Sequence, residues 1–148
     1  MRRAPKSRQW GATAVEFALV LLIFLTFLLA ITDFSRMLFT WNAAAEATRA
    51  GARYAVVCDN TTRDAQVLAK MQAMLPQIDD IDVVWDPPGC TTGTCEGVTV
   101  SIVGLDYQWI SPIAGLGTAV APISMPTFQT YLPREIMGTD PNDATICF

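Results

Sequence analysis

The sequence predicts an α+β protein in which one long N-terminal helix is followed by a small exported domain with a second helix and an antiparallel sheet of about three strands. A run from residue 12 to residue 32 carries only one charge, and no proline interrupts residues 12–57. Alternating apolar and polar residues follow in the second half, as expected of half-buried strands. We therefore divide the chain into a basic leader (1–11), a helix (12–57) and an exported domain (58–148).

Residues 12–32 are expected to cross a lipid bilayer. Twenty-one helical residues span roughly 31 Å, close to the thickness of the hydrocarbon layer. Four basic residues and no acid precede this segment, which by the positive-inside rule keeps the N-terminus in the cytoplasm and exports the remainder. These topology residues are Arg2, Arg3, Lys6 and Arg8.

An ordinary cleavable signal peptide fits the same segment less well. Its apolar region is normally 7–15 residues long and ends in small residues at positions −3 and −1. A cut after Ala30 would place Leu28 at position −3, which is too large. An uncut signal anchor is a further alternative.

Composition narrows the classes of function. From Asp33 onward there are thirteen acids and six basic residues, a balance of −7, which argues against nucleic acid as a partner. The chain has no histidine, so His-dependent nucleophile systems are excluded. Four aspartates within residues 79–86 lack the spacing of an EF-hand, so a solvated strand edge is preferred to a calcium site. We expect neither an enzyme nor a bound cofactor or metal.

The helix is expected to continue beyond the membrane as an amphipathic segment over residues 33–57. Asp33 with Arg36, and Glu46 with Arg49, are three residues apart and suit surface ion pairs. Gly51 is the weak point of this helix. Apolar and small residues at spacings of three and four form a stripe, which is predicted to serve as a core face, a seam against neighbouring helices, or both: Ile31, Phe34, Leu38, Trp41, Ala45, Thr48, Ala52 and Ala55.

The remaining elements are read from periodicity and from turn residues. A second helix, capped by Thr61 or Thr62, is expected to run up to Pro76. A strand over 81–85 points Ile81, Val83 and Trp85 to one side. The next strand is expected to run from residue 98 to 109 with a bulge beside Gly104, followed by an ordered loop over 113–126 and a last strand over 127–132.

All four cysteines lie beyond the apolar segment, which agrees with export to an oxidising compartment. Three pairings are possible; we favour Cys90 with Cys95 because they are near neighbours, which leaves Cys58 with Cys147. Zinc is the alternative, but there are no paired C-x-x-C elements.

Glu16 stands at the edge of the apolar run. An ionised carboxylate in hydrocarbon costs about 2.5 kcal/mol or more unless it finds a partner, so this residue is a functional candidate. The surrounding segment 8–20, RQWGATAVEFALV, resembles the start of the TadE-like pseudopilins of the tight-adherence (Flp-type) pilus system. Weaker likenesses follow at residues 107–117 and 132–135.

The resemblance implies a mode of processing. In the wider type IV pilin class a prepilin peptidase cuts after the glycine, here Gly11, and the fifth mature residue is glutamate. A cut before Ala12 makes Glu16 that fifth residue, and the new amine of Ala12 is the group that would neutralise it, within one chain or between two.

The resemblance also implies a location and partners. The chain would be a minor pseudopilin of the bacterial inner membrane, with a periplasmic domain, contributing to an adhesive pilus. Its partners would be the prepilin peptidase, other pilin-like subunits and the inner-membrane pilus assembly machinery. The competing interpretation is an uncleaved single-pass membrane protein whose periplasmic domain binds a partner or ligand.

Overall fold

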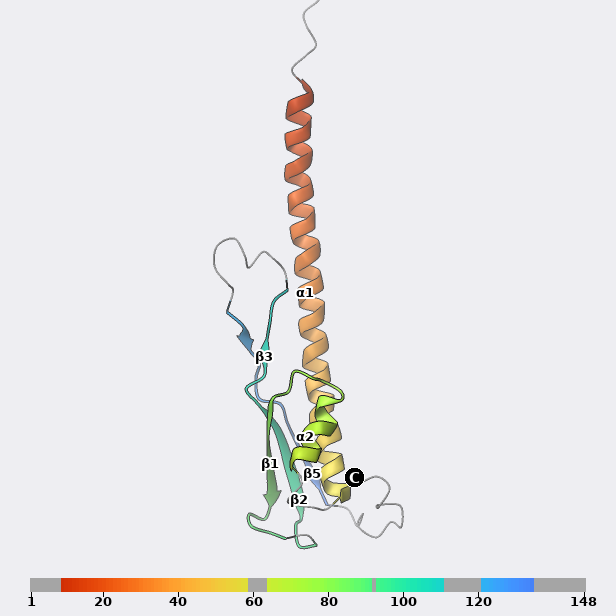
Figure 1. Ribbon diagram of the computed structural model, residues 1–148, viewed down its shortest axis with the longest axis vertical. Helices are drawn as coiled ribbons and strands as arrows, with labels where there is room; N and C mark the ends of the chain where they lie inside the picture. Colours follow the sequence, from red (N-terminus) through yellow and green to blue (C-terminus); the bar gives the residue numbers. More distant parts are fainter. Residues whose placement is uncertain (1–8, 59–63, 92, 111–120, 135–148) are drawn as a thin grey trace, which may run out of the picture. The chain divides into compact units, whose positions relative to one another are not determined.

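The computed structural model describes residues 9–58, 64–91, 93–110 and 121–134 and has the predicted α+β architecture (Figure 1). The chain divides into two compact units. One consists of Met1–Arg36 and Trp109–Val120, and the other of Met37–Gln108 and Ala121–Phe148. We call them the first and second units. The elements in chain order are α1 (Gln9–Cys58), α2 (Asp64–Gln72), β1 (Asp80–Asp86), β2 (Gly97–Val103), β3 (Asp106–Tyr107), β4 (Ile123–Ser124) and β5 (Gln129–Pro133).

Helix α1 is continuous over 50 residues. It begins at Gln9, slightly before the expected start, and no proline follows Pro5 until Pro76. Proline is the residue that most reliably breaks a helix, so nothing in this stretch forces an interruption. The helix therefore enters both units, and its two halves have different surroundings.

The second unit contains the three-stranded antiparallel sheet, with β2 between β1 and β5. The predicted inward face of β1 is confirmed, since Ile81, Val83 and Trp85 are partly buried and pack against the core. On β2, the buried residues Val98, Val100 and Ile102 lie on the same face of the sheet. Because side chains alternate along a strand, the acids of β1 point to the opposite, exposed face.

The core of the second unit lies between this sheet, α2 and the distal half of α1 (Figure 1). The face that α1 contributes consists almost entirely of small residues, and they are Ala44, Ala47, Thr48, Gly51, Ala52 and Ala55. Small side chains allow the sheet and α2 to approach the helix axis closely. The residue Val56 completes this face near the end of the helix.

The predicted stripe on α1 serves as a core face only in its distal part, and the role of its first part as a seam stays a prediction. Thr48, Ala52 and Ala55 are buried, but Ile31, Phe34, Leu38 and Trp41 are exposed by 45–55%. The core thus takes the small residues of the stripe, and the large apolar ones stay exposed. Trp41 still packs edge-on against Phe128 within the second unit, with ring centroids 5.1 Å apart.

The single long strand expected from residue 98 to 109 is wrong. Strand β2 ends at Val103, and Gly104 takes a positive φ of 67° that turns the chain out of the first sheet. The following residues form β3, which pairs with β4 in a separate two-stranded sheet. The change of phase at Gly104 is therefore a break between strands and not a bulge within one strand. Of the expected loop 113–126, residues 113–120 lie outside the described residues.

Helix α2 ends at Gln72, before the expected limit at Pro76. Two tight turns follow, in which the Met74 N–H donates to the Met71 carbonyl and the Ile78 N–H donates to the Leu75 carbonyl. They carry Leu75 and Ile78 back into the core. Val67, which the pattern did not single out, is the second buried residue of α2 beside Met71. The candidate caps Thr61 and Thr62 lie outside the described residues.

Gly51 allows α1 and α2 to come together. A methyl group at this position would lie 2.6 Å from the Met71 sulfur and 2.8 Å from its Cγ. Met71 is fully buried, so its side chain has little room to move away. Gly51 is therefore a packing requirement and not simply a weak point of the helix.

We expect Gly51→Ala to destabilise the second unit. The substitution gains about 1 kcal/mol in helix propensity, but overpacking of a core typically costs about 1–3 kcal/mol. The thermal midpoint of the full chain in detergent, followed by circular dichroism with disulfides intact, should fall. The double variant Gly51→Ala/Met71→Ala should be less destabilised than the sum of the two single variants, because each relieves part of the other's effect. A higher midpoint for Gly51→Ala alone would contradict this account.

Candidate assembly surface

The residues predicted for processing lie in the first turns of α1. Gly11 is exposed, and apart from the backbone of its own helical turn no atom of the described residues lies within 4 Å of the place where its Cβ would be. Ala12 and Glu16 are four residues apart, so they lie on one face of the helix a turn from each other. Glu16 is exposed and forms no hydrogen bond or ion pair within the part of the chain that the structure describes. The basic residues Arg2, Arg3, Lys6 and Arg8 lie outside that part.

The apolar surface that follows Glu16 is uncovered. Residues 11–25 are all exposed, and the helix is long and apolar enough to span a membrane. Its hydroxyl groups are satisfied within the helix: Thr26 donates to the Leu22 carbonyl at 2.7 Å and Thr32 to the Leu29 carbonyl at 2.7 Å. Such internal bonds allow Thr to lie in an apolar surrounding without an unpaired donor.

A shallow depression of about 340 Å³ interrupts this surface, lined by Leu22, Ile23, Thr26, Phe27 and Ala30. The small residues Thr26 and Ala30 lie one turn apart along it. Small residues at this spacing let another helix approach closely, so the depression suits a side chain from a neighbouring helix.

Asp33 directly follows the apolar segment, and its burial differs from the surface position that the sequence predicts. It was expected in a surface ion pair but is only 3% exposed. Its Oδ1 accepts a hydrogen bond from the Ile110 N–H at 3.2 Å, and the Arg36 guanidinium lies 3.7 Å from the same oxygen. The signal that could have revealed it is the position of a lone acid directly at the end of an apolar run, where burial requires a specific partner.

The expected disulfide between Cys90 and Cys95 is present. Its loop is also held by the hydroxyl of Thr94, which accepts a hydrogen bond from the Thr91 N–H at 2.9 Å. Cys58 is disulfide-bonded as well. Its predicted partner, Cys147, lies outside the described residues, so that pairing stays a prediction.

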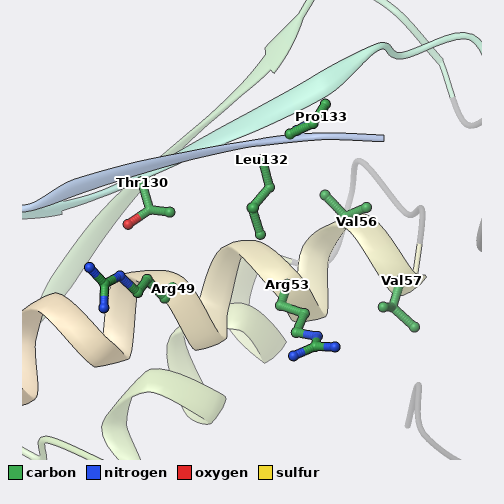
Figure 2. A pocket seen from close by; sticks show the side chains of 7 residues that line it. All are labelled: Arg49, Arg53, Val56, Val57, Thr130, Leu132 and Pro133. Carbon is green, nitrogen blue, oxygen red and sulfur yellow. The ribbon is translucent and has the colours of Figure 1, made fainter. Parts of the chain in front are cut away.

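A groove in the second unit separates α1 from β5. Its volume is about 420 Å³, and Figure 2 shows its lining residues, which are Arg49, Arg53, Val56, Val57, Thr130, Leu132 and Pro133. The side chains of Thr130 and Leu132 point from β5 toward the helix (Figure 2). The walls are thus largely apolar, with two arginines one helical turn apart. Sequence reasoning did not find this groove, because residues 49–57 and 130–133 are brought together only by the fold.

Within the described ranges no three residues of the types His, Cys, Asp or Glu come close enough to hold an ion. The contacts described above are hydrogen bonds, ion pairs and apolar surfaces, which suit association with other chains.

Residues 11–53 match the model of the family described as TadE-like protein. The match confirms the resemblance to TadE-like proteins over the part of the chain where the predicted motif and the apolar helix lie, somewhat less than a third of the sequence. It indicates involvement in the Tad (Flp-type) pilus system and hence, in general terms, partners from that system. Comparisons with curated proteins and with solved structures gave no match.

We expect substitutions of Asp33 to separate its hydrogen bond from its charge. Asp33→Ala leaves the Ile110 N–H without its acceptor, and a hydrogen bond to a charged group is worth about 1.5–3 kcal/mol. The amide of Ile110 should then exchange with deuterium about 10–100-fold faster, as measured by mass spectrometry of the full chain in detergent. Asp33→Asn retains an acceptor oxygen and should preserve most of the protection. Equal exchange in Asp33→Ala and the parent would show that this bond does not hold the segment.

Proposed function

We propose that this chain is a minor pseudopilin of the tight-adherence pilus. It is inserted in the inner membrane with its N-terminus in the cytoplasm, cut by a prepilin peptidase between Gly11 and Ala12, and assembled with other pilin-like subunits. Its role is structural rather than catalytic. The family match over residues 11–53 supports the pilus system, and the geometry of α1 supports the finer role.

The observation that carries the proposal is the continuity of α1 from an uncovered apolar half into a packed distal half. The first half presents large apolar side chains on all sides, among them Phe17, Leu22, Ile23 and Phe27. Such a surface is stable in lipid, and it is equally stable against other apolar helices. A subunit of this form can therefore pass from a membrane into a bundle of helices without refolding.

Glu16 provides the specificity that an apolar surface lacks. Apolar packing tolerates sliding of one helix along another, but a single buried charge fixes the register, because a slip of about one turn, 5.4 Å, separates it from its partner. Within the described residues Glu16 has no partner in its own chain. The amine of Ala12 on an adjacent subunit is the group that the proposal assigns to it.

The competing role, an uncleaved membrane protein that binds a ligand through its periplasmic domain, makes a different demand on the N-terminus. It requires the leader to stay attached, whereas a pseudopilin releases it. The N-terminal residue of the mature chain therefore distinguishes the two roles.

Gly11→Val should block processing. A protease that cuts at the membrane edge needs close access to the backbone, and a branched side chain obstructs it. Intact-mass analysis of the membrane-extracted protein should show the full-length chain for Gly11→Val and a chain beginning at Ala12 for the parent. Gly11→Ala is the matched control, since its methyl group clashes with no side chain among the described residues, and we expect it still to be cut. A mature Gly11→Val chain beginning at Ala12 would remove this site from consideration.

Glu16→Gln should be inserted and cut like the parent but be depleted from the sheared pilus fraction. Glutamine keeps the size and hydrogen-bonding capacity of glutamate and removes only its charge. If Glu16 merely favours the helix macrodipole, its charge is worth under about 1 kcal/mol and the variant should be recovered normally. Glu96→Gln, which removes an exposed charge outside the helix, serves as the control. Immunoblots of membrane and pilus fractions measure the partition, and equal recovery of both variants would refute an assembly role for Glu16.

A further inference from the structure

Two arginines gather at the groove of a domain that is otherwise acidic. Arg49 and Arg53 are two of the six basic residues that follow the apolar segment, against thirteen acids. Arg49 pairs with Glu46 on the exposed surface of α1. Arg53 forms no hydrogen bond or ion pair within the described residues. Because the arginines stand beside the apolar walls formed by Val56, Val57 and Leu132, the groove suits an occupant that is acidic at one end and apolar at the other.

A surface that carries acids and one exposed apolar residue lies on the other edge of the same sheet. Strand β1 is one edge and β5, which lines the groove, is the opposite edge. Asp80, Asp82, Val84 and Asp86 lie on the exposed face of β1, and Val84 is 49% exposed. The Oδ1 of Asp80 accepts a hydrogen bond from the Ile81 N–H, while the Asp82 side chain has no partner within the described residues.

The spacing of the two surfaces agrees. Alternate residues of a strand are about 6.6 Å apart, and residues separated by one helical turn of four residues rise about 6 Å. Asp80 and Asp82 can therefore meet Arg49 and Arg53 as a pair. Continuing in the same direction, Val84 reaches the level of Val56 and Val57, so two charges followed by an apolar residue correspond on the two surfaces. Asp86, the next residue on this face of β1, falls past the end of α1 at Cys58.

We propose that a second copy of this chain docks the exposed face of its β1 strand, through Asp80, Asp82 and Val84, into the groove lined by Arg49 and Arg53. The contact joins different surfaces of the two copies, so it repeats in one direction and does not close into a symmetric dimer. It rests on the proposed function for its setting in an assembly of pilin-like subunits. It extends that function by naming a contact between the folded domains in addition to the packing of helices.

The edge of β5 favours docking of side chains over the addition of a strand. The Ile102 N–H donates to the Phe128 carbonyl and the Arg134 N–H donates to the Glu96 carbonyl, so the even-numbered residues around β5 direct their backbone groups toward β2. Pro133 consequently lies on the outward edge, where it has no N–H to offer. A proline at an edge blocks continuous pairing with another strand.

Zero-length carbodiimide coupling tests the contact, because it joins an amine to a carboxylate only when the two touch. Arg53→Lys keeps the charge and supplies the amine. Equal amounts of isotopically light and heavy full-length chains, purified in detergent, are coupled and digested, and mixed-isotope peptides report links between copies. Lys70, an exposed lysine on α2 outside the groove, is the internal control.

In the Arg53→Lys chain we expect mixed-isotope links from the introduced amine to Asp80 or Asp82, with about tenfold fewer from Lys70. Links from the introduced amine should fall about tenfold when Asp80 and Asp82 are changed to Asn, and raising the salt concentration should reduce them as well. A charge exchange shows whether a loss of links comes from misfolding or from the lost charges. Chains carrying Arg49→Glu/Arg53→Glu, mixed with chains carrying Asp80→Lys/Asp82→Lys, should again give links between copies.

Three results would overturn the proposal: links from the introduced amine at the frequency of Lys70, links only within one copy, or links to other acids. Neither cutting at Gly11 nor pilus recovery enters this measurement. Its failure is therefore distinct from failure of the proposed function.

Discussion

The unbroken course of α1 is the constraint on which the rest of the structure depends. Because no residue between Gln9 and Cys58 interrupts it, a single helix must be stable in two surroundings. Its first half exposes large apolar side chains, and its distal half provides one wall of a protein core. Neither half can be adjusted by a break in the backbone, so the adaptation has to come from the side chains along one helix.

The adaptation in the distal half is a face of small residues. Ala44, Ala47 and Ala52 are completely buried, and Gly51 leaves the space that Met71 fills. The large apolar residues of the core come instead from the sheet, α2 and the turns after it, for example Val98, Ile102 and Ile78. This division gives a close contact between a helix and a sheet in a domain too small for a thick core, since a small domain has little interior to fill with large side chains on both surfaces. It also leaves the large apolar residues of α1, such as Phe34 and Leu38, on the exposed side of the helix.

The sequence predicts those features of the structure that depend on residues close together in the chain. The long helix, the inward face of β1 and the family resemblance around Gly11 and Glu16 depend on patterns within a few turns of chain, and the structure and the family match agree with them. The break at Gly104 and the burial of Asp33 depend on partners far along the chain, β4 and Ile110, which no periodicity reveals. The groove is missed for the same reason, because Arg53 and Leu132 become neighbours only through the fold.

The two acids that flank the apolar segment of α1 show how one chain can be stable alone and still require others. Asp33 and Glu16 are separated by about 25 Å along a helix, so in the proposed membrane-spanning segment they lie near its two boundaries. Asp33 is neutralised within its own chain by Arg36 and by the Ile110 N–H, and its burial therefore depends on no other subunit. Glu16 has no such partner among the described residues, and in a membrane it can reach the polar interface, where its charge is tolerated. In the proposed fibre Glu16 no longer reaches the polar interface of the membrane. A partner for its charge is therefore required only at the N-terminal end of the helix. Such an assembly has a direction, because it is always the N-terminal end of the helix, with Glu16, that needs a neighbouring subunit.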